Sequence, residues 1–161
     1  MYFLDDLITN TIEESRESLK NAIEANEKGT ARRFCIILKK NRKLIGAVGY
    51  EIASETPAEK IADPMGWFIM PEYQNKGYIT EAAKKVLEFA FLQDNCIKVI
   101  TGCYKDNIPT QKVMTKLGFR KEIEKTNAQW HDNKMKDRLK FAINKTEFID
   151  ISQPHNKGVH I

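Results

Sequence analysis

The sequence predicts a single α/β (α+β) domain, in which helices flank a central sheet. Its 161 residues, 42% of them hydrophobic, suffice for one substantial core and are too few for two ordinary domains. The hydrophobic period changes from that of a strand to that of a helix near residue 79, and it changes again further along the chain. These changes predict the order helix, three strands, helix, strand, helix and two strands. We assign residues 1–150 to the domain and residues 151–161 to a C-terminal tail.

The first predicted element is a helix over residues 11–26. Thr11 and Glu14 have the spacing of a capping box, in which each side chain accepts a hydrogen bond from the backbone of the other residue. The pattern of an amphipathic helix follows, and its apolar stripe consists of Ile12, Leu19, Ala22 and Ile23.

A hairpin follows this helix. Residues 34–38 and residues 44–52 both alternate between apolar and other side chains, which is typical of strands. Gly46 and Gly49 in the second strand are candidates for a β-bulge, because a glycine inside a strand often marks one. Residues 53–63 include several charges, and we predict that they form a loop leading to the next strand.

A strand, a polar loop and a helix occupy residues 66–91, and the rest of the chain is organised around them. Residues 67–70 form a short apolar run, which Pro71 ends because proline cannot donate to a β-ladder. From Ile79 onward one face of the predicted helix is apolar and the other is charged. In the loop between them, Gly77 allows a close approach of the backbone to a ligand, or a positive φ angle.

The turn before this helix suits an anion such as a phosphate. A helix N-terminus leaves four N–H groups without intrahelical partners and carries a partial positive charge. Lys76 adds a full charge. A lone glycine in a polar turn is more often an ordinary connection, so the interpretation depends on a second motif that follows.

The second motif begins a further helix after a strand at residues 97–104. Asn107 precedes this helix, Pro109 lies in its first turn, and Gly118 stops it in the manner of a C-terminal cap. Two more strands are predicted at residues 120–125 and 135–143. The tail has no clear period, and we expect it to be loosely held.

The two motifs resemble those of the GNAT superfamily of N-acetyltransferases, in particular the branch of the RimJ and RimL ribosomal-protein N-terminal acetyltransferases. The family loop [QR]xxGx[GA] corresponds to QNKGYI at residues 74–79. The later Nxx[ST] with a terminal [KR]LGF corresponds to Asn107, Thr110 and KLGF at residues 116–119. One residue departs from the pattern: Ile79 replaces a small residue, and its side chain either crowds a bound diphosphate or turns into the core.

The resemblance implies the GNAT acyl-CoA N-acyltransferase fold, with a mixed, mainly antiparallel central sheet. Members of the family begin with a strand and a short helix before the helix placed here at residues 11–26, and this chain is expected to lack that first strand. The strand at residues 34–38 then has an unpaired edge, which folded proteins normally cover. We expect a partner subunit, as in a homodimer, or the C-terminal tail to cover it.

The resemblance also implies a donor and its binding residues. Acetyl-CoA supplies an acetyl group that passes directly from the thioester to a primary amine. The backbone of Ile69 and Met70 is expected to meet pantetheine, and Asn107 to meet the pantetheine arm or the part near the adenine. The pyrophosphate is expected to lie against the loop and helix start, formed by Gln74, Asn75, Lys76, Gly77, Tyr78, Ile79 and Thr80.

The implied catalytic residues are less distinct than the donor site. Thr110 is placed to protonate the leaving thiolate, although a hydroxyl in the first turn of a helix is equally a structural feature, and Asn107 has the residue type of an ordinary N-cap. An attacking amine must be neutral, and the glutamate that often serves the family as a base is Pro64 here. Asp63 and Glu51 are the remaining candidates, and each is more often a solvated carboxylate.

Composition excludes several other classes of protein. The net charge of +4 is spread without a long basic block, and no nucleic-acid-binding module is recognisable. No apolar run reaches membrane-spanning length, and acids near the N-terminus are unlike a signal peptide, so we expect a soluble, cytoplasmic protein with no membrane partner.

The potential metal ligands and nucleophiles are interpreted as structural residues. Cys35, Cys96 and Cys103 lack metal-binding spacing and are expected to be reduced, with Cys103 filling the core. The three histidines are expected at the surface, and we predict no metal site. They are His131, His155 and His160.

These observations favour an acetyl-CoA-dependent N-acetyltransferase. The acceptor is open between the α-amine of a protein N-terminus and a small-molecule amine such as a polyamine, and the branch resemblance favours the first. The alternative is a non-catalytic acyl-CoA-binding regulatory module, which Ile79, the expected loss of the first strand and the missing glutamate would explain. A third alternative, a basic nucleic-acid-binding domain, has little support beyond the net charge.

Overall fold

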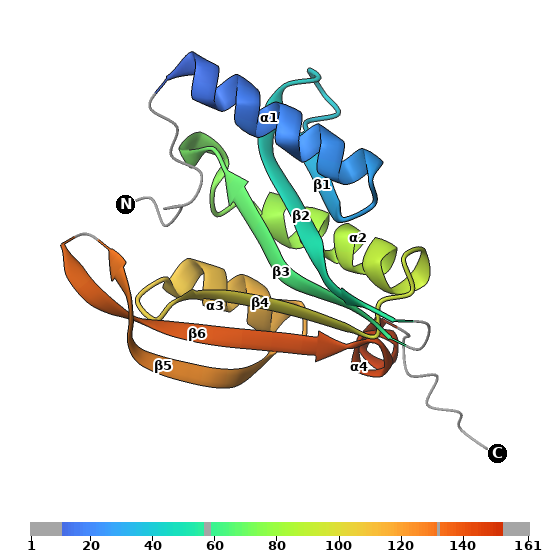
Figure 1. Cartoon of the computed structure of the whole chain (residues 1–161), viewed down its shortest axis with the longest axis vertical. Helices are drawn as coiled ribbons and strands as arrows, with labels where there is room; N and C mark the ends of the chain where they lie inside the picture. The colour runs from blue at the N-terminus through green and yellow to red at the C-terminus, as the bar shows by residue number, and fades with distance from the viewer. Residues whose placement is uncertain (1–10, 57–58, 132, 153–161) are drawn as a thin grey trace.

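The computed structural model describes residues 11–56, 59–131 and 133–152, which form a six-stranded sheet flanked by helices (Figure 1). The strand order is β1-β2-β3-β4-β6-β5. Only β3 and β4 pair in parallel, so the expected mixed, mainly antiparallel sheet is confirmed. In chain order the helices and strands are α1 Ile12–Glu27, β1 Ala31–Ile37, β2 Leu44–Glu55, β3 Lys60–Ile69, a 3-10 turn Pro71–Tyr73, α2 Tyr78–Leu92, β4 Lys98–Tyr104, α3 Ile108–Lys116, β5 Arg120–His131, β6 Lys134–Asn144 and α4 Lys145–Ser152.

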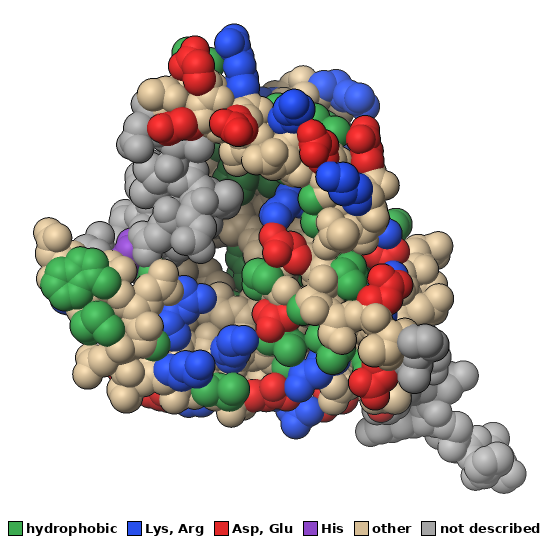
Figure 2. Space-filling model, viewed as in Figure 1, with side chains coloured by type: hydrophobic (Ala, Val, Ile, Leu, Met, Phe, Trp, Pro, Cys, Tyr) green, Lys and Arg blue, Asp and Glu red, His purple; other side chains and the backbone are tan. Residues whose placement is uncertain are grey.

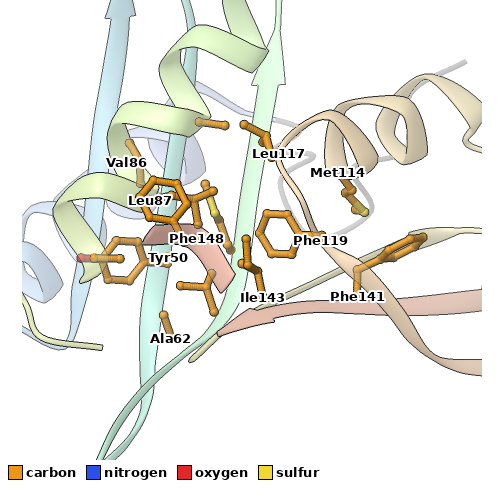
Figure 3. Packing of buried hydrophobic residues seen from close by; sticks show 14 of the residues in the cluster. Tyr50, Ala62, Val86, Leu87, Met114, Leu117, Phe119, Phe141, Ile143 and Phe148 are labelled. Carbon is orange, nitrogen blue, oxygen red and sulfur yellow. The ribbon is translucent and has the colours of Figure 1, made fainter. Parts of the chain in front are cut away.

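Helices α2 and α3 lie on one face of the sheet, and α1 lies on the opposite face beside β1 and β2 (Figure 1). The main core fills the space between the sheet and the first of these layers. Figure 3 shows side chains from four elements converging there: Tyr50 of β2, Leu87 of α2, Ile143 of β6 and Phe148 of α4. The core therefore joins both halves of the sheet through α2.

Both predicted helix caps are confirmed. The Thr11 side chain accepts a hydrogen bond from the N–H of Glu14, and the Glu14 carboxylate accepts one from the N–H of Thr11, which completes the capping box. At the start of α3, the Asn107 side chain accepts a hydrogen bond from the N–H of Thr110. Gly118 follows α3 with a φ of +87°, as a C-terminal cap requires.

The apolar stripe of α1 is exposed rather than buried. Ile12, Leu19 and Ile23 are 66%, 62% and 50% exposed, and no residue of the helix is fully buried. Helix α1 is tied to the sheet by polar contacts, because the side chain of Asn26 makes two hydrogen bonds with the backbone of Arg33 in β1. The sequence pattern suggested that this stripe is part of the core, but it contributes little to the core.

Two glycines of β2 allow close contact between strands. A Cβ atom at Gly46 would lie 2.4 Å from the carbonyl oxygen of Phe68, and one at Gly49 would lie 2.3 Å from that of Arg32. The register of β1 against β2 shifts next to Gly46, so the expected bulge is there, whereas Gly49 lies in a regular stretch. Both positions exclude larger side chains for steric reasons.

The prediction of a loop over residues 53–63 is wrong. Strand β2 continues to Glu55 and β3 already begins at Lys60, so most of that segment is strand. The pairing of β3 with β4 skips from Ala62 to Met65, because Pro64 interrupts the ladder between them. A proline inside the run is the reason why the sequence pattern placed the strand start several residues too late.

The C-terminal end of the domain also differs from the prediction. Residues 145–152 form helix α4, which was not predicted, and its Phe148 packs against Phe91 of α2 with ring centroids 5.2 Å apart. Strand β5 continues to His131, and β6 runs from Lys134 to Asn144. Both strands are therefore longer than the predicted strands at residues 120–125 and 135–143. Residues 153–161 of the expected tail lie outside the described residues.

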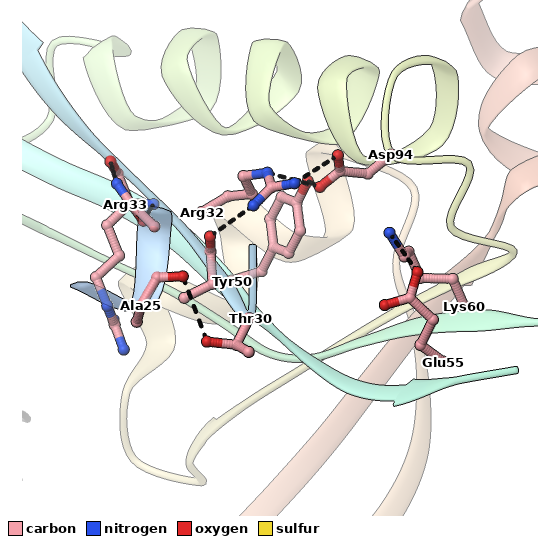
Figure 4. A network of polar contacts seen from close by, with 10 residues as sticks. Ala25, Thr30, Arg32, Arg33, Tyr50, Glu55, Lys60 and Asp94 are labelled. Carbon is pink, nitrogen blue, oxygen red and sulfur yellow. Dashed lines mark hydrogen bonds and ion pairs between the residues drawn. The ribbon is translucent and has the colours of Figure 1, made fainter. Parts of the chain in front are cut away.

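A polar network ties the end of α2 to β1 and β2 (Figure 4). The Arg32 guanidinium contacts both carboxylate oxygens of Asp94, at 2.9 and 3.1 Å, and the Tyr50 hydroxyl donates to the same carboxylate at 2.7 Å. Burial and the neighbouring carboxylate raise the pKa of Tyr50, so its hydroxyl stays protonated and acts as a donor. The network fixes α2 over the sheet half that carries β3.

Strand β1 pairs with β2 alone and forms one edge of the described sheet. The expected first strand would fall in residues 1–10, outside the described residues, so its absence, and the cover of this edge by a partner or by the tail, stay predictions. Among the described helices, none is long and apolar enough to cross a membrane.

Candidate functional site

The two central strands separate at one end, and a cleft opens between them. Strands β3 and β4 pair from Ile61 to Met65, opposite Lys98 to Thr101, and they make no further pairs beyond that point. The buried Thr101 hydroxyl donates to the Met65 carbonyl at 2.7 Å, which satisfies the last carbonyl before the strands part. Figure 1 shows β3 and β4 diverging from this point.

The cleft has a volume of about 560 Å³. One wall is β3 from Met65 to Ile69 together with the loop and first turn of α2, and the other is the end of β4 with the first turns of α3. The space-filling view shows the molecule hollowed between the lobe that carries α1 and the lobe that carries β5 and β6 (Figure 2). Backbone groups that would pair in a closed sheet therefore face this space.

The backbone of Ile69, at the end of β3, and of Met70, just after it, was expected to meet pantetheine, and of the two only Ile69 lines the cleft. The N–H of Met70 donates to the Ile45 carbonyl of β2 at 2.8 Å, so it points away from the cleft, and Met70 does not line it. Successive residues of a strand direct their N–H groups to opposite neighbours, which turns the N–H of Ile69 toward the cleft. The N–H of Ile69, and not that of Met70, can therefore reach a group bound in the cleft.

The N-terminus of α2 is open toward the cleft. Gly77 is the N-cap with a φ of +83°, and no side chain caps the helix, in contrast to α1 and α3. No described atom lies within 4 Å of the position that a Cβ of Gly77 would take. The N–H groups of the first turn are thus presented to an open space, where they can bind an anion such as a diphosphate.

The side chain of Ile79 is largely buried at the start of α2. Ile79 is 8% exposed and belongs to the buried face of α2, so of the two alternatives it turns inward. Gln74 donates from its side-chain nitrogen to the Ile69 carbonyl at 3.4 Å, which links the loop to the cleft end of β3. The departure from the family loop pattern is therefore compatible with a bound diphosphate.

Most of the predicted loop lines the cleft, and one residue does not. The lining residues of this segment are Gln74, Asn75, Gly77, Tyr78, Ile79 and Thr80. Lys76 is exposed, and its ammonium group donates to the Glu72 carbonyl at 2.7 Å and lies over the Tyr73 ring. The charge of Lys76 is held near the mouth of the cleft and outside its wall.

Asn107 and Thr110 bring the start of α3 into the cleft. Asn107 is buried and serves as N-cap through its side-chain oxygen, as the ordinary interpretation of its residue type predicts. Thr110 also lines the cleft, and its hydroxyl makes no hydrogen bond to any described residue. A hydroxyl in this position can donate to a group bound in the cleft.

Neither predicted carboxylate lines the cleft. Asp63 precedes the point where the strands part and pairs with Lys140 of β6 at 3.4 Å. Glu51 lies on β2 and pairs with Arg33. No aspartate or glutamate occurs among the cleft-lining residues of the described chain.

Tyr104 and Arg138 complete the cleft on the β4 side, and sequence reasoning missed both. They face each other in the β4–β6 pairing, and the guanidinium carbon of Arg138 lies 5.0 Å from the centre of the Tyr104 ring. Residue 138 is 34 positions from residue 104, so only the sheet topology brings them together. The alternation of β6 was visible in the sequence, but its pairing partner was not.

The expected surface position of His131 is wrong. This histidine is 8% exposed at the end of β5, and its ring stacks on Tyr104 with centroids 4.7 Å apart. The long β5–β6 hairpin carries His131 back over the sheet, which a strand ending at residue 125 would not do. His155 and His160 lie outside the described residues.

The cysteines are free, and the one in the cleft is protonated at neutral pH. Cys103 lines the cleft, and burial raises the pKa of its thiol to about 11. A thiol in that state is a poor nucleophile, in agreement with its interpretation as a core residue. No group of three His, Cys, Asp or Glu side chains in the described part of the chain is arranged to hold a metal ion.

Comparison with known proteins identifies this architecture. The family model of the acetyltransferase (GNAT) domain matches residues 2–120. The uncharacterized N-acetyltransferase YnaD of Bacillus subtilis (strain 168) is 36% identical over 125 residues, covering 73% of this chain and 71% of YnaD.

Two solved structures have the same fold. The ribosomal-protein-S5-alanine acetyltransferase from Vibrio fischeri matches with a TM-score of 0.74 and 22% identity, over 88% of this chain and 74% of that one. The spermidine N-acetyltransferase from Vibrio cholerae, in complex with CoA and spermine, matches with a TM-score of 0.73 and 19% identity, over 84% and 77% of the two chains. With the family match, the parted strands and the uncapped helix that begins within QNKGYI, the chain belongs to the GNAT acetyltransferases and is an acetyl-CoA-dependent N-acetyltransferase.

Proposed function

We propose that this chain acetylates the α-amine at the N-terminus of a peptide or protein, with acetyl-CoA bound in the cleft between β3 and β4. The observation that carries the choice of acceptor is the lack of a carboxylate among the described cleft-lining residues. An α-amine has a pKa near 8, so a substantial fraction is neutral at physiological pH without a base. A lysine-type or polyamine nitrogen, with a pKa of about 10.4, depends on a base far more.

The first turn of α2 holds the pyrophosphate in this proposal. Its N–H groups have no intrahelical partners, no side chain caps them, and Gly77 leaves the approach open. The partial positive charge of the helix N-terminus adds to the attraction. Gln74, Asn75 and Thr80 line the same region, and Lys76 stands near the entrance as a further cation.

The parted strands hold the pantetheine arm. The backbone of β3 offers Ile69 on the cleft side, and Asn107 approaches from the start of α3. A backbone N–H aimed at the thioester carbonyl would stabilise the negative charge that grows on its oxygen during attack by the amine. The N–H of Ile69 is positioned for such a contact, whereas that of Met70 is engaged with Ile45.

Thr110 completes the transfer as a proton donor. When the amine nitrogen forms its bond to the acetyl carbon, the carbon–sulfur bond breaks and the sulfur leaves as a thiolate. The Thr110 hydroxyl lines the cleft, makes no hydrogen bond to a described residue, and can give its proton to that sulfur directly or through water. The amine loses its own proton to solvent, so Asp63 is not needed as a base.

Release of free CoA from acetyl-CoA tests the proposal. The assay compares a short peptide with a free N-terminus, the same peptide with an acetylated N-terminus, and spermidine. We expect CoA release with the free peptide only. Preferential use of spermidine would overturn the choice of acceptor.

Thermal unfolding with acetyl-CoA separates a catalyst from a binding module. At a hundredfold excess of acetyl-CoA over its dissociation constant, the protein should be stabilised by about 2.7 kcal/mol. Stabilisation of this size without CoA release from any amine would support a non-catalytic acyl-CoA-binding module instead.

A further inference from the structure

We propose that Arg138 selects acceptors in which a carboxylate lies close to the reacting amine. This inference rests on the proposed function, because it concerns the acceptor end of the same cleft. It names a residue that determines specificity and the chemical class of acceptor that the residue recognises: an amine with a nearby carboxylate, and not a polyamine.

The position of Arg138 is fixed by the sheet. Residue 138 of β6 pairs with Tyr104 of β4, two residues beyond Gly102 and so on the same face of the sheet. An atom at the missing Cβ position of Gly102 would lie 3.6 Å from Nη2 of Arg138, so the guanidinium covers the place that a side chain would occupy. Gly102 and Arg138 both line the cleft.

Two glycines open the cleft at this point on the face opposite α2. Gly66 and Gly102 follow Met65 and Thr101, the last residues that pair β3 with β4. Because Met65 and Thr101 are buried on the core side, the next residue of each strand faces the other side. Gly66 has no atom within 4 Å of its Cβ position, so no side chain of the described residues blocks the opening there.

This opening is the way by which an acceptor reaches the donor. On the core side the first turns of α2 and α3 line the cleft, and in the proposed function the donor occupies the space along β3. Figure 2 shows the face opposite α2 hollowed at this place, with Lys and Arg side chains gathered along the rim formed by β6. An amine that enters here passes Arg138.

The Arg138 guanidinium is held in place before any acceptor binds. Its Nη1 donates to the side-chain oxygen of Gln129 at 2.6 Å, and the group lies over the Tyr104 ring. Both contacts leave the charge intact, because an amide and an aromatic ring are neutral. A guanidinium that is already oriented loses little side-chain entropy when it binds a carboxylate in a bidentate manner.

The charge of Arg138 differs from that of its neighbours on β6. Lys136 pairs with Asp106 at 2.8 Å, and Lys140 pairs with Asp63 at 3.4 Å. No carboxylate of the described residues lies within 4 Å of the Arg138 guanidinium. Among the described residues of β6 at the acceptor entrance, Arg138 therefore has a charge that no carboxylate neutralises, which attracts an anion and repels a polyamine.

Two kinds of acceptor share this chemistry. One is a free α-amino acid, whose carboxylate carbon is two bonds from the amine nitrogen. The other is a peptide N-terminus followed by an acidic side chain. Two matched pairs distinguish them: alanine against alaninamide, and Ala-Glu-Ala-amide against Ala-Gln-Ala-amide.

Rates of CoA release by the wild-type protein and by Arg138→Gln provide the test. We expect wild-type kcat/KM to favour the acidic member of at least one pair by about tenfold or more, which is the effect of one charge-assisted contact. In Arg138→Gln the preference should disappear, because kcat/KM falls for the acidic member far more than for the neutral one. Lys140→Gln is the matched control, because it removes one charge from the same strand and should leave the preference intact.

Equal rates for both members of each pair in the wild type would overturn the inference, as would a preference that survives in Arg138→Gln. Equilibrium titration of the same pairs into protein saturated with CoA gives a second readout that needs no turnover. If no amine releases CoA, the proposed function fails. The titration then still decides the role of Arg138 by the presence or absence of tighter acidic binding.

Discussion

The Thr101 hydroxyl donates to the Met65 carbonyl at 2.7 Å, at the last residue pair that joins β3 to β4. On one side of this contact the sheet is continuous, and on the other it is open to the cleft. Thr101 is 2% exposed, so a water molecule cannot take over the hydrogen bond if the hydroxyl is lost. This single hydrogen bond therefore lies between the paired part of β3 and β4 and the cleft that is proposed to bind acetyl-CoA.

Replacing Thr101 by valine should destabilise the protein and weaken donor binding. The change keeps the shape of the side chain and removes the buried hydrogen bond to the Met65 carbonyl, which costs about 0.5–1.5 kcal/mol of unfolding free energy. We also expect a higher KM for acetyl-CoA, because the hydrogen bond that holds β3 and β4 together at the closed end of the cleft is lost. Denaturant unfolding measures the first effect and initial rates the second. Thr115→Val, which removes an exposed hydroxyl bonded within α3, should change stability by less than about 0.5 kcal/mol.

A carboxylate at position 77 should repel the donor. Gly77→Asp places a negative charge at the N-terminus of α2, while Gly77→Asn introduces a side chain of the same shape without the charge. Both variants share the cost of a positive φ angle, so their difference reports the charge alone. In a calorimetric titration we expect the aspartate variant to bind CoA at least about tenfold more weakly than the asparagine variant. Equal affinities would show that the pyrophosphate lies elsewhere.

Removing the Thr110 hydroxyl should slow the chemical step. Thr110→Val should lower kcat by about a hundredfold, which is typical of the loss of a general acid, and change KM for acetyl-CoA little. Thr110→Ser keeps a hydroxyl in the same place and should retain most of the activity. If valine and serine variants were equally active, Thr110 would be only a residue of the first turn of α3.

The thiol of Cys103 should resist alkylation at neutral pH. Burial raises the pKa of Cys103 to about 11, and burial likewise raises the pKa of Cys96 to about 11. Cys35 is exposed, so iodoacetamide at pH 7.5 should modify one thiol per folded chain, and none in Cys35→Ser. Rapid modification of a second thiol at that pH would contradict the burial of the cleft residue.

The same shifts predict a loss of stability in alkali. The folded protein holds the protons of Cys96 and Cys103 more tightly than the unfolded chain, whose thiols have a reference pKa of 9.0. Their contribution to stability is therefore complete below about pH 9 and is lost as the pH rises toward about 11. Denaturant unfolding at several pH values should show this decline, with a smaller slope in Cys103→Ala.

Local patterns in the sequence predicted most of the fold. Thr11, Asn107 and Gly118 act through neighbours a few residues away, so their capping roles were readable from spacing alone. The strand, loop and helix around Gly77 were equally local. Ile79 was ambiguous from sequence because the direction of a side chain at a helix start depends on the layer beneath it, which is the sheet.

The elements that sequence reasoning missed depend on distant contacts. Helix α4 is short, and Phe148 is held by residues far away in the sequence, such as Phe91 of α2. Strand β3 tolerates Pro64 because its partners on both sides hold the rest of the strand. Arg138 reaches the cleft through the pairing of β6 with β4, which no local pattern records.

A crystal structure of the protein with CoA tests the central claim most directly. We expect the pyrophosphate within hydrogen-bonding distance of N–H groups in the first turn of α2, and the pantetheine arm between β3 and β4 beside the N–H of Ile69. CoA bound at another surface, or an α2 N-terminus covered by the side chain of Ile79, would contradict the account.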